Sequence, residues 1–297
     1  MNTENAINFD APSVDTPTIS SSAMLVELSI SQWAGRKTDK RVTKKVKYDE
    51  GATENSGSFS KNLLPDEPIF DRVGSLMGAM RTEHYHSTMP WANQGPRLLT
   101  TPMFFEYSKT LTALKQEQEE DALPHFFAEY DRMVARAPHK LAGLFDIYDY
   151  PDLDTLKQKF SVALNYYPVP TAGDFRVDVG NEAMEVLRSS YANYYDTQLK
   201  GAYKDVWKRT HEALTNMSKR LEGKEKQRFH DTLVTNVTDM VELLDKFNIT
   251  DDADMRKAKQ RLEQALRGIT PDGLREDSAL RLETKAKVDE VLREFAW

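Results

Sequence analysis

The chain has 297 residues, which is enough for one large domain or for two of ordinary size. Its 39% hydrophobic and 29% charged residues indicate a globular chain, and the net charge of -7 excludes a surface that is basic throughout, although not a local basic patch. The absence of cysteine excludes disulfides, thiolate nucleophiles and sulfur-ligated metals, and no apolar run reaches the ~18 residues that span a bilayer.

Residues 1–22 are expected to form a disordered tail. The stretch MNTENAINFDAPSVDTPTISSS contains three acids and no Lys or Arg, and it is rich in Ser, Thr, Asn and Pro. Such a composition buries too little apolar surface to offset the conformational entropy lost on folding. It also lacks a basic region followed by an apolar core, so we expect no secretory signal.

Residues 23–180 are predicted to form a mixed α/β domain. Apolar and polar residues alternate along 24–33, which is typical of a strand with one polar face. Val42 and Val46 are four residues apart within a basic run, as they are on one stripe of a helix. Apolar residues at helical spacing predict a further helix over 66–87.

The second half of this domain is predicted to contain a long helical segment over 103–140. Pro124 is expected to kink or interrupt it. A short helix over 152–160 follows, capped by its first residue, an aspartate. Residues 161–169 and 175–179 have extended patterns, and together with the first strand they are expected to form a small sheet.

Residues 181–297 are predicted to form a helical domain with a long antiparallel hairpin. Apolar residues recur at three- and four-residue steps over 182–221, which predicts one helix about 60 Å long. A second stripe over 229–247 follows a short glycine-containing turn. Two shorter helices are expected near 251–267 and 277–295. The predicted fold class is therefore mainly α with a small β-sheet, that is, α+β.

The segment LSISQWAGRKTDKRVTKKVK, residues 28–47, concentrates basic residues in an acidic chain. The candidate nucleic-acid-binding residues here are Trp33, Arg36, Lys37, Lys40, Arg41, Lys44, Lys45 and Lys47. On a helix, positions 37, 40/41, 44 and 47/48 lie on one face, so we expect several of these charges to face one phosphate backbone, while Trp33 is placed to stack on a base. The alternative is a solvated helix face whose Val42 and Val46 pack on the core.

A second basic stretch lies at the predicted hairpin tip, between Lys200 and Arg228. It holds nine Lys and Arg against four acids, with Tyr203 and Trp207 inside it. An ordinary helical-hairpin surface is favoured over a second nucleic-acid contact. Nucleic-acid binding becomes the stronger interpretation if both basic regions face the same way.

No motif indicates catalysis or a bound cofactor. His84 and His86 point in different directions on a helix and have no third ligand at metal spacing, so structural roles are favoured. Residues 248–254 lack the glycine and closing glutamate of a calcium loop, and Thr250 or Asp251 is expected to cap a helix. Phosphate-loop, dinucleotide and nucleophile-elbow motifs are absent. We therefore predict no catalytic residue, no metal site, no cofactor and no enzymatic activity.

Four stretches carry a resemblance to a known family, and they are AMLVELSISQWAGRKTDKRVTK, HYHSTMPWANQGPRLL, YYPVPTAGDFRVDVG and FHDTLVTNVTDMVELLDKFNITDD. In this order they resemble an uncharacterised family of tailed-phage proteins, a domain of unknown function. The resemblance covers about residues 23–295, and the PWxxxGxRLL core is its most specific element. It implies a phage or prophage product of the bacterial host cytoplasm, whose gene can lie among replication, recombination or ATPase genes. The family supplies no catalytic residues.

The core PWANQGPRLL also has a physical interpretation of its own. Its prolines and Gly95 are expected to fix a rigid turn, which Trp91, Leu98 and Leu99 anchor to the core. Arg97 is either a buried partner of a carboxylate, the favoured role, or an exposed phosphate contact. We keep it among the nucleic-acid-binding candidates.

Two functions follow as expectations. The leading one is a non-enzymatic phage accessory protein of nucleic-acid metabolism that binds DNA, single- or double-stranded, or a replication or recombination partner. The alternative is an interaction or assembly factor whose hairpin docks on an ATPase, a host protein or a second copy of the chain. No membrane partner is expected. DNA binding through Lys and Arg weakens steeply with salt, whereas docking through apolar surface does not.

Overall fold

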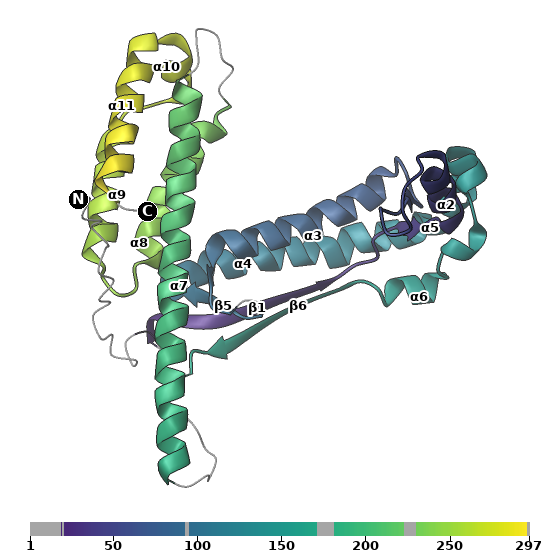
Figure 1. Cartoon of the computed structure of the whole chain (residues 1–297), viewed down its shortest axis with the longest axis horizontal. Helices are drawn as coiled ribbons and strands as arrows, with labels where there is room; N and C mark the ends of the chain where they lie inside the picture. Colours follow the sequence, from purple (N-terminus) through teal and green to yellow (C-terminus); the bar gives the residue numbers. More distant parts are fainter. Residues whose placement is uncertain (1–18, 20, 93–94, 171–180, 223–229, 296–297) are drawn as a thin grey trace. The chain divides into compact units, whose positions relative to one another are not determined.

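The computed structural model describes residues 19, 21–92, 95–170, 181–222 and 230–295 (Figure 1). It confirms a mainly helical fold with a small sheet. The chain divides into two compact units: unit 1 consists of Met1–Glu27, His86–Phe105 and Tyr166–Trp297, and unit 2 consists of Leu28–Tyr85 and Glu106–Asn165. Each unit combines separate stretches of sequence, so this division differs from the predicted boundary at residue 180.

The elements of the described residues are, in chain order, β1 Ala23–Ser31, β2 Arg36–Thr38, α2 Lys40–Asp49, β3 Ser60–Asn62, α3 Pro68–Ser87, β4 Met89–Pro90, β5 Arg97–Thr100, α4 Thr101–Glu117, the π-helix η1 Gln118–Ala122, α5 Leu123–Leu141, the 3-10 helices η2 Ala142–Leu144 and η3 Ile147–Asp149, α6 Leu153–Lys157, β6 Ser161–Pro168, α7 Asn181–Leu221, α8 Thr232–Phe247, α9 Ala253–Leu266, α10 Pro271–Glu276 and α11 Ser278–Glu294. None of these described helices is both long and apolar enough to cross a bilayer.

Four strands form one sheet in the order β4-β5-β1-β6. β5 pairs antiparallel with β1, where Val26 lies opposite Arg97, and also with β4. The strands predicted at 24–33 and 161–169 are confirmed as β1 and β6, whereas the one predicted at 175–179 lies outside the described residues. β4 and β5 were not predicted, because the prolines and glycine around them indicate a turn.

In unit 1, α7 packs against α8 and α11, and α9 packs against the same two helices, so that four helices lie side by side (Figure 1). The stripe predicted over 182–221 is confirmed as one helix, and its buried residues are Tyr195, Leu199, Ala202, Val206, Trp207, Thr210, Leu214, Met217, Ser218 and Leu221. The polar Thr210 is satisfied, since its hydroxyl donates to the carbonyl of Val206 at 2.9 Å. The turn between α7 and α8 lies outside the described residues.

The segment His86–Phe105 joins unit 1 through bonds to residues far along the chain. The hydroxyl of Thr100 donates to the carbonyl of Lys246 at 2.8 Å. The Nη2 atom of Arg209 donates to the carbonyl of Thr88 at 3.0 Å. These long-range bonds make the units discontinuous in sequence, which is why hydrophobic periodicity alone places the boundary elsewhere.

A hydrophobic core of unit 2 is supplied largely by α3 and α5. Its buried members are Leu64, Val73, Leu76, Ala122, Leu123, Phe126, Tyr130, Met133 and Leu156. The predicted interruption near Pro124 is confirmed, because a π-helical turn separates α4 from α5 and Pro124 lies in the first turn of α5. The fixed φ of proline suits the first turn of a helix, which is where it is best tolerated.

One residue of the predicted tail belongs to a core. Ile19 is fully buried, so the expectation that all of residues 1–22 form a disordered tail is wrong at this position. The composition of the stretch favours disorder on average, but one branched apolar side chain is enough to be removed from water. Residues 1–18 and 20 lie outside the described residues.

Candidate nucleic-acid interface

Helix α2 begins where Asp39 caps it. The Asp39 carboxylate accepts a hydrogen bond from the backbone N–H of Val42 at 2.9 Å, and this bond lowers the pKa of Asp39 below its ordinary value. Arg36 and Lys37 therefore do not continue the helix. They lie on β2, which pairs antiparallel with β3, and this corrects the expectation that position 37 shares the helix face.

Helix α2 turns its cations to the solvent. Its Lys40, Arg41, Lys44 and Lys45 are exposed, and Lys47 is half-buried. At about 100° per residue these five side chains cover one arc of the helix, opposite Val42 and Val46. We call the cations of β2 and α2 the basic surface, and they are Arg36, Lys37, Lys40, Arg41, Lys44, Lys45 and Lys47.

The apolar side of α2 contributes little to a core. None of the ten described residues of this helix is buried, and Val46 is 48% exposed. The interpretation of the basic run as a solvated face anchored by two docked valines is therefore not supported at Val46. A helix of this length is marginal in water without packing, so its contacts at the ends must hold it.

Two cations of the basic surface are tethered to the protein. Arg41 donates from its Nη2 atom to the carbonyl of Gly143 at 2.8 Å, and Lys47 donates to the carbonyl of Glu54. The remaining five are Arg36, Lys37, Lys40, Lys44 and Lys45, and none of their side chains has a hydrogen bond or ion pair within the described part of the chain. These five charges are available to an anionic partner.

This arrangement is electrostatically unfavourable for an isolated helix. Lys40 and Lys44, like Arg41 and Lys45, are like charges at i and i+4, which costs about 0.2–0.5 kcal/mol per pair. The first turn after the cap Asp39 has two cations and no acid, although the helix dipole favours negative charge there. A local conflict of this kind is typical of a functional surface.

A buried lysine fixes the surroundings of α2. The Nζ atom of Lys61 lies 2.6 Å from the Oδ2 atom of Asp149 and 3.9 Å from that of the helix cap Asp39. It also donates to the carbonyl of Leu144 at 2.6 Å. A buried charge needs such partners. The cluster therefore ties the start of α2 to the segment Ala142–Asp149, which carries η2 and η3.

Two exposed tyrosines, one on α2 itself and one on the segment anchored to it, were missed by sequence analysis. Tyr48 is 87% exposed and lies on α2 between Lys44 and Arg41 in helical projection. Tyr148 is 92% exposed and lies on η3. The spacing of four residues between Lys44 and Tyr48 was a usable signal for the first. No local pattern marks the second, because its position depends on the Lys61 cluster.

Trp33 does not belong to this surface. Its ring lies 5.6 Å from that of Phe70 and 6.1 Å from that of Tyr130, so it packs against the core of unit 2. This corrects the prediction that Trp33 stacks on a base. The ring is held by other aromatic side chains, and moving it would open the core.

Arg97 has a structural role, as the sequence favoured, but it is half-buried and its described hydrogen bonds go to Thr88 and not to the predicted carboxylate. Its Nε atom donates to the hydroxyl of Thr88 at 2.6 Å and its Nη2 atom to the Thr88 carbonyl at 2.9 Å. Trp91, Leu98 and Leu99 are buried around it, as predicted. Arg97 belongs to unit 1 and the basic surface to unit 2, so we leave it out of the interface.

The second basic stretch is largely an ordinary helix surface. Arg209 is paired with Asp205, and Lys208 lies 3.9 Å from Glu212 on the next turn. Its exposed cations without a partner in the described part of the chain are Lys200, Lys204, Lys219 and Arg220. Lys224, Lys226 and Arg228 lie outside the described residues. The stretch belongs to unit 1, and its described cations are interspersed with Asp205, Glu212 and Glu222.

The histidine and aspartate motifs have structural roles. His84 is buried, and its Nδ1 atom lies 2.7 Å from the hydroxyl of Tyr107. Helix α9 is capped by Asp252, which accepts from the N–H of Met255 at 2.8 Å, and not by Thr250 or Asp251 as predicted. Among the described residues, no group of three His, Asp or Glu is placed to hold a metal ion.

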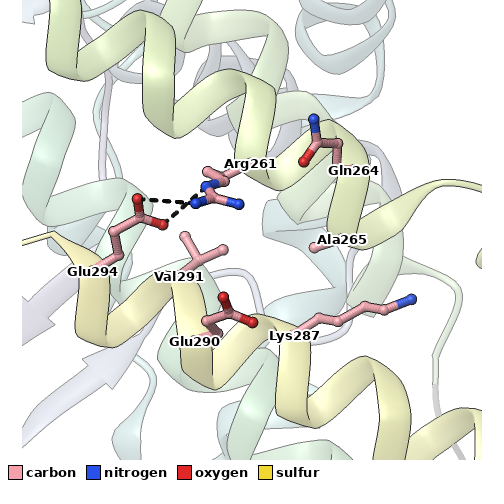
Figure 2. A pocket seen from close by; sticks show the side chains of 7 residues that line it. All are labelled: Arg261, Gln264, Ala265, Lys287, Glu290, Val291 and Glu294. Carbon is pink, nitrogen blue, oxygen red and sulfur yellow. Dashed lines mark hydrogen bonds and ion pairs between the residues drawn. The ribbon is translucent and has the colours of Figure 1, made fainter.

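A shallow pocket lies between α9 and α11 in unit 1 (Figure 2). Across it, the Nε atom of Arg261 lies 3.1 Å from the Oε2 atom of Glu294, and the Nζ atom of Lys257 lies 2.9 Å from Oε1. These interactions lower the pKa of Glu294, and the hydrogen bond from Lys257 has the largest effect. Lys287 pairs with Glu283. Most charged side chains at the pocket form ion pairs with one another. The described lining therefore shows no nucleophilic side chain with a base beside it.

Comparison with protein-family models, curated proteins and solved structures finds no match for this chain. The resemblance to a tailed-phage family therefore stays a prediction. The case for a functional site rests on the charge, exposure and anchoring of the basic surface.

Proposed function

We propose that this chain is a non-enzymatic nucleic-acid-binding protein and that the basic surface of unit 2 holds the phosphate backbone. The observation that carries the proposal is the set of five exposed cations without a partner in the described chain, in a protein of net charge -7. A partner experiences the local field rather than the net charge, so the acidic remainder does not prevent binding.

The geometry suits a phosphate backbone. The ten residues of α2 extend over about 15 Å, and its basic arc faces solvent along that length. Lysine and arginine that neutralise phosphates release condensed counterions, which supplies most of non-specific affinity. Contacts to phosphate carry no sequence information, so the expected binding is independent of sequence.

The cellular role is part of the same proposal. The resemblance to tailed-phage proteins supports an accessory role in phage nucleic-acid metabolism, in the cytoplasm of a bacterial host. A replication or recombination protein on the same strand is a compatible partner, because a phosphate-holding surface leaves unit 1 available for other contacts.

The test is fluorescence anisotropy with labelled single- and double-stranded DNA from about 50 to 200 mM salt, where phosphate contacts lose most affinity. The variant Lys40→Gln/Lys44→Gln/Lys45→Gln removes three charges without partners and keeps Arg41, which anchors the helix. The matched control Lys200→Gln/Lys204→Gln/Lys219→Gln removes three exposed charges from α7. Both variants have the same net charge.

The α2 variant should lose affinity tenfold or more at low salt, and its slope of log K against log salt should flatten by about two to three units. The control should bind like the wild type. Wild-type protein that binds neither form of DNA at low salt overturns the proposal. Equal losses in the two triple variants also overturn it, because net charge alone would then explain binding.

A second function, docking on a protein partner through the helices of unit 1, has specific support. Val186 is 65% exposed on α7, Leu282 is 66% exposed on α11, and Tyr194 is also exposed. Apolar residues without cover within the described chain are typical of interaction surfaces when they are contiguous. Salt-insensitive association that the change Val186→Ser/Tyr194→Ser abolishes would favour this function over the first.

A further inference from the structure

Tyr48 lies inside the basic surface and not at its margin. In helical projection its side chain falls between Lys44 and Arg41, and Lys40 lies on the same arc. Its ring is 87% exposed and has no hydrogen bond or ring contact within the described residues. A large aromatic side chain held in water among cations contributes nothing to the packing of unit 2.

Two anchors tie the segment that carries Tyr148 to α2. Arg41 of the basic arc donates to the carbonyl of Gly143, and Lys61 links Asp149 to the helix cap Asp39. The segment Ala142–Asp149 therefore runs along the Arg41 side of α2. Tyr148 precedes Asp149 in that segment, and its side chain too has no hydrogen bond or ring contact within the described residues.

Exposed tyrosine rings favour single-stranded over double-stranded nucleic acid as the ligand. A duplex stacks its bases internally and offers cations only its phosphates, so exposed tyrosines beside those cations gain little from it. A single strand exposes the faces of its bases, and aromatic side chains among cations stack on them. From this pairing of free rings with free charges we infer that the basic surface binds single-stranded nucleic acid, with Tyr48 and Tyr148 stacking on bases.

This inference rests on the proposed function and specifies its ligand. A membrane surface is the less suitable partner, because an interfacial helix presents a continuous apolar face and α2 has one exposed valine opposite its cations. The cations of α2 bind phosphates while the tyrosines bind bases, so the two classes of side chain have separable effects on affinity and on its salt dependence.

The experiment measures anisotropy with an oligothymidylate of about 16 nucleotides, at the upper end of common site sizes, and with a duplex of equal length. The variants are Tyr48→Ala, Tyr148→Ala and the corresponding phenylalanine substitutions, which keep the ring. Tyr85→Ala is the control, because Tyr85 is an exposed tyrosine of the same unit on α3. Vesicles with anionic lipid serve as a further probe.

The wild type should prefer the single strand. Each alanine variant should bind it about tenfold more weakly with an unchanged salt slope and unchanged duplex affinity. The phenylalanine variants and Tyr85→Ala should bind like the wild type. The inference is overturned by equal affinity for duplex and single strand, by alanine variants that bind normally, or by tyrosine-dependent binding to vesicles alone. Absence of binding to both oligonucleotides overturns the proposed function itself, which is a distinguishable result.

Discussion

The ammonium group of Lys61 lies 2.6 Å from the carboxylate of Asp149, although the lysine side chain is only 5% exposed. This ion pair joins β3 to η3. The same ammonium group lies 3.9 Å from a second carboxylate, that of Asp39, which caps α2. One buried cation thus links β3 and η3 to the start of α2, the helix that carries most of the basic surface. A lysine placed in this way organises a surface without being part of it.

Lys61→Met should destabilise the protein by about 3 kcal/mol, because it leaves the carboxylates of Asp39 and Asp149 without their shared cation in a poorly solvated place. Urea unfolding followed by circular dichroism measures the loss. The control Lys37→Met removes an exposed lysine from the paired position on β2 and should cost little. A Lys61 variant as stable as the wild type would show that the cluster is solvated.

N-terminal truncations that keep Ile19 and those that remove it should differ in stability. Because this side chain is fully buried, Ile19→Ala should lower stability by about 2 kcal/mol or more, and deletion of residues 1–22 by at least as much. Deletion of 1–18 alone should have a smaller effect, as the composition of that stretch predicts. Differential scanning calorimetry of the three proteins tests this order, and equal melting temperatures for the wild type and Ile19→Ala would contradict it.

Gln118 is a candidate for a stabilising substitution. Both polar atoms of its side chain are buried in η1 without a hydrogen-bond partner in the described chain. Gln118→Met keeps the shape and removes the unmet polar groups, so it should raise stability by about 1 kcal/mol. The exposed Gln116, whose amide donates to Glu120, is the control for the same substitution. A destabilised Gln118→Met protein would mean that ordered water satisfies the amide.

Glu67 should make stability depend on acid pH. Burial raises the pKa of this carboxyl, but hydrogen bonds from Lys140 and Arg136 outweigh burial and hold it below its ordinary value of 4.5. A lowered pKa in the folded state contributes stability above pH 4.5, and this contribution is lost as the pH falls through the folded value. Urea unfolding from neutral pH to pH 3 should show a decline that is smaller in Glu67→Gln.

The bundle of unit 1 allows one substitution to be compared at two sites. Leu214 on α7 is fully buried, whereas Leu282 on α11 is 66% exposed. Leu214→Asp buries an unpaired charge and should cost more than about 4 kcal/mol or prevent folding, while Leu282→Asp should change stability by less than about 0.5 kcal/mol. Helicity and thermal melting report both effects. Similar melting of the two variants would place the Leu214 face on the surface.

The long helices were predictable because their signal is local. The stripe over 182–221 repeats at the period of a helix, and α7 ends at the predicted residue. The cap at Asp152 and the break at Pro124 were predictable for the same reason, since each depends on residues within one turn. The fold class is predictable from the number and length of such helices and strands.

The rest depends on partners that are distant in the sequence. β5 forms because β1 lies beside it, and the prolines and glycine near Arg97 conceal that pairing. Trp33 is a core residue only because Phe70 and Tyr130 meet it. The basic run was identified correctly as an exposed cluster, but Trp33, the aromatic residue assigned to it, packs in the core, whereas the exposed Tyr48 was overlooked.

The exposure of α2 has a consequence for its dynamics. None of its described residues is buried, so opening this helix exposes almost no new apolar surface, whereas opening α5 would expose Phe126 and Tyr130. Its amide protons should therefore exchange with solvent through local opening, at a free energy well below that of global unfolding. A bound ligand that stabilises α2 would slow this exchange, so amide protection along residues 40–49 would report occupancy without any label on the ligand.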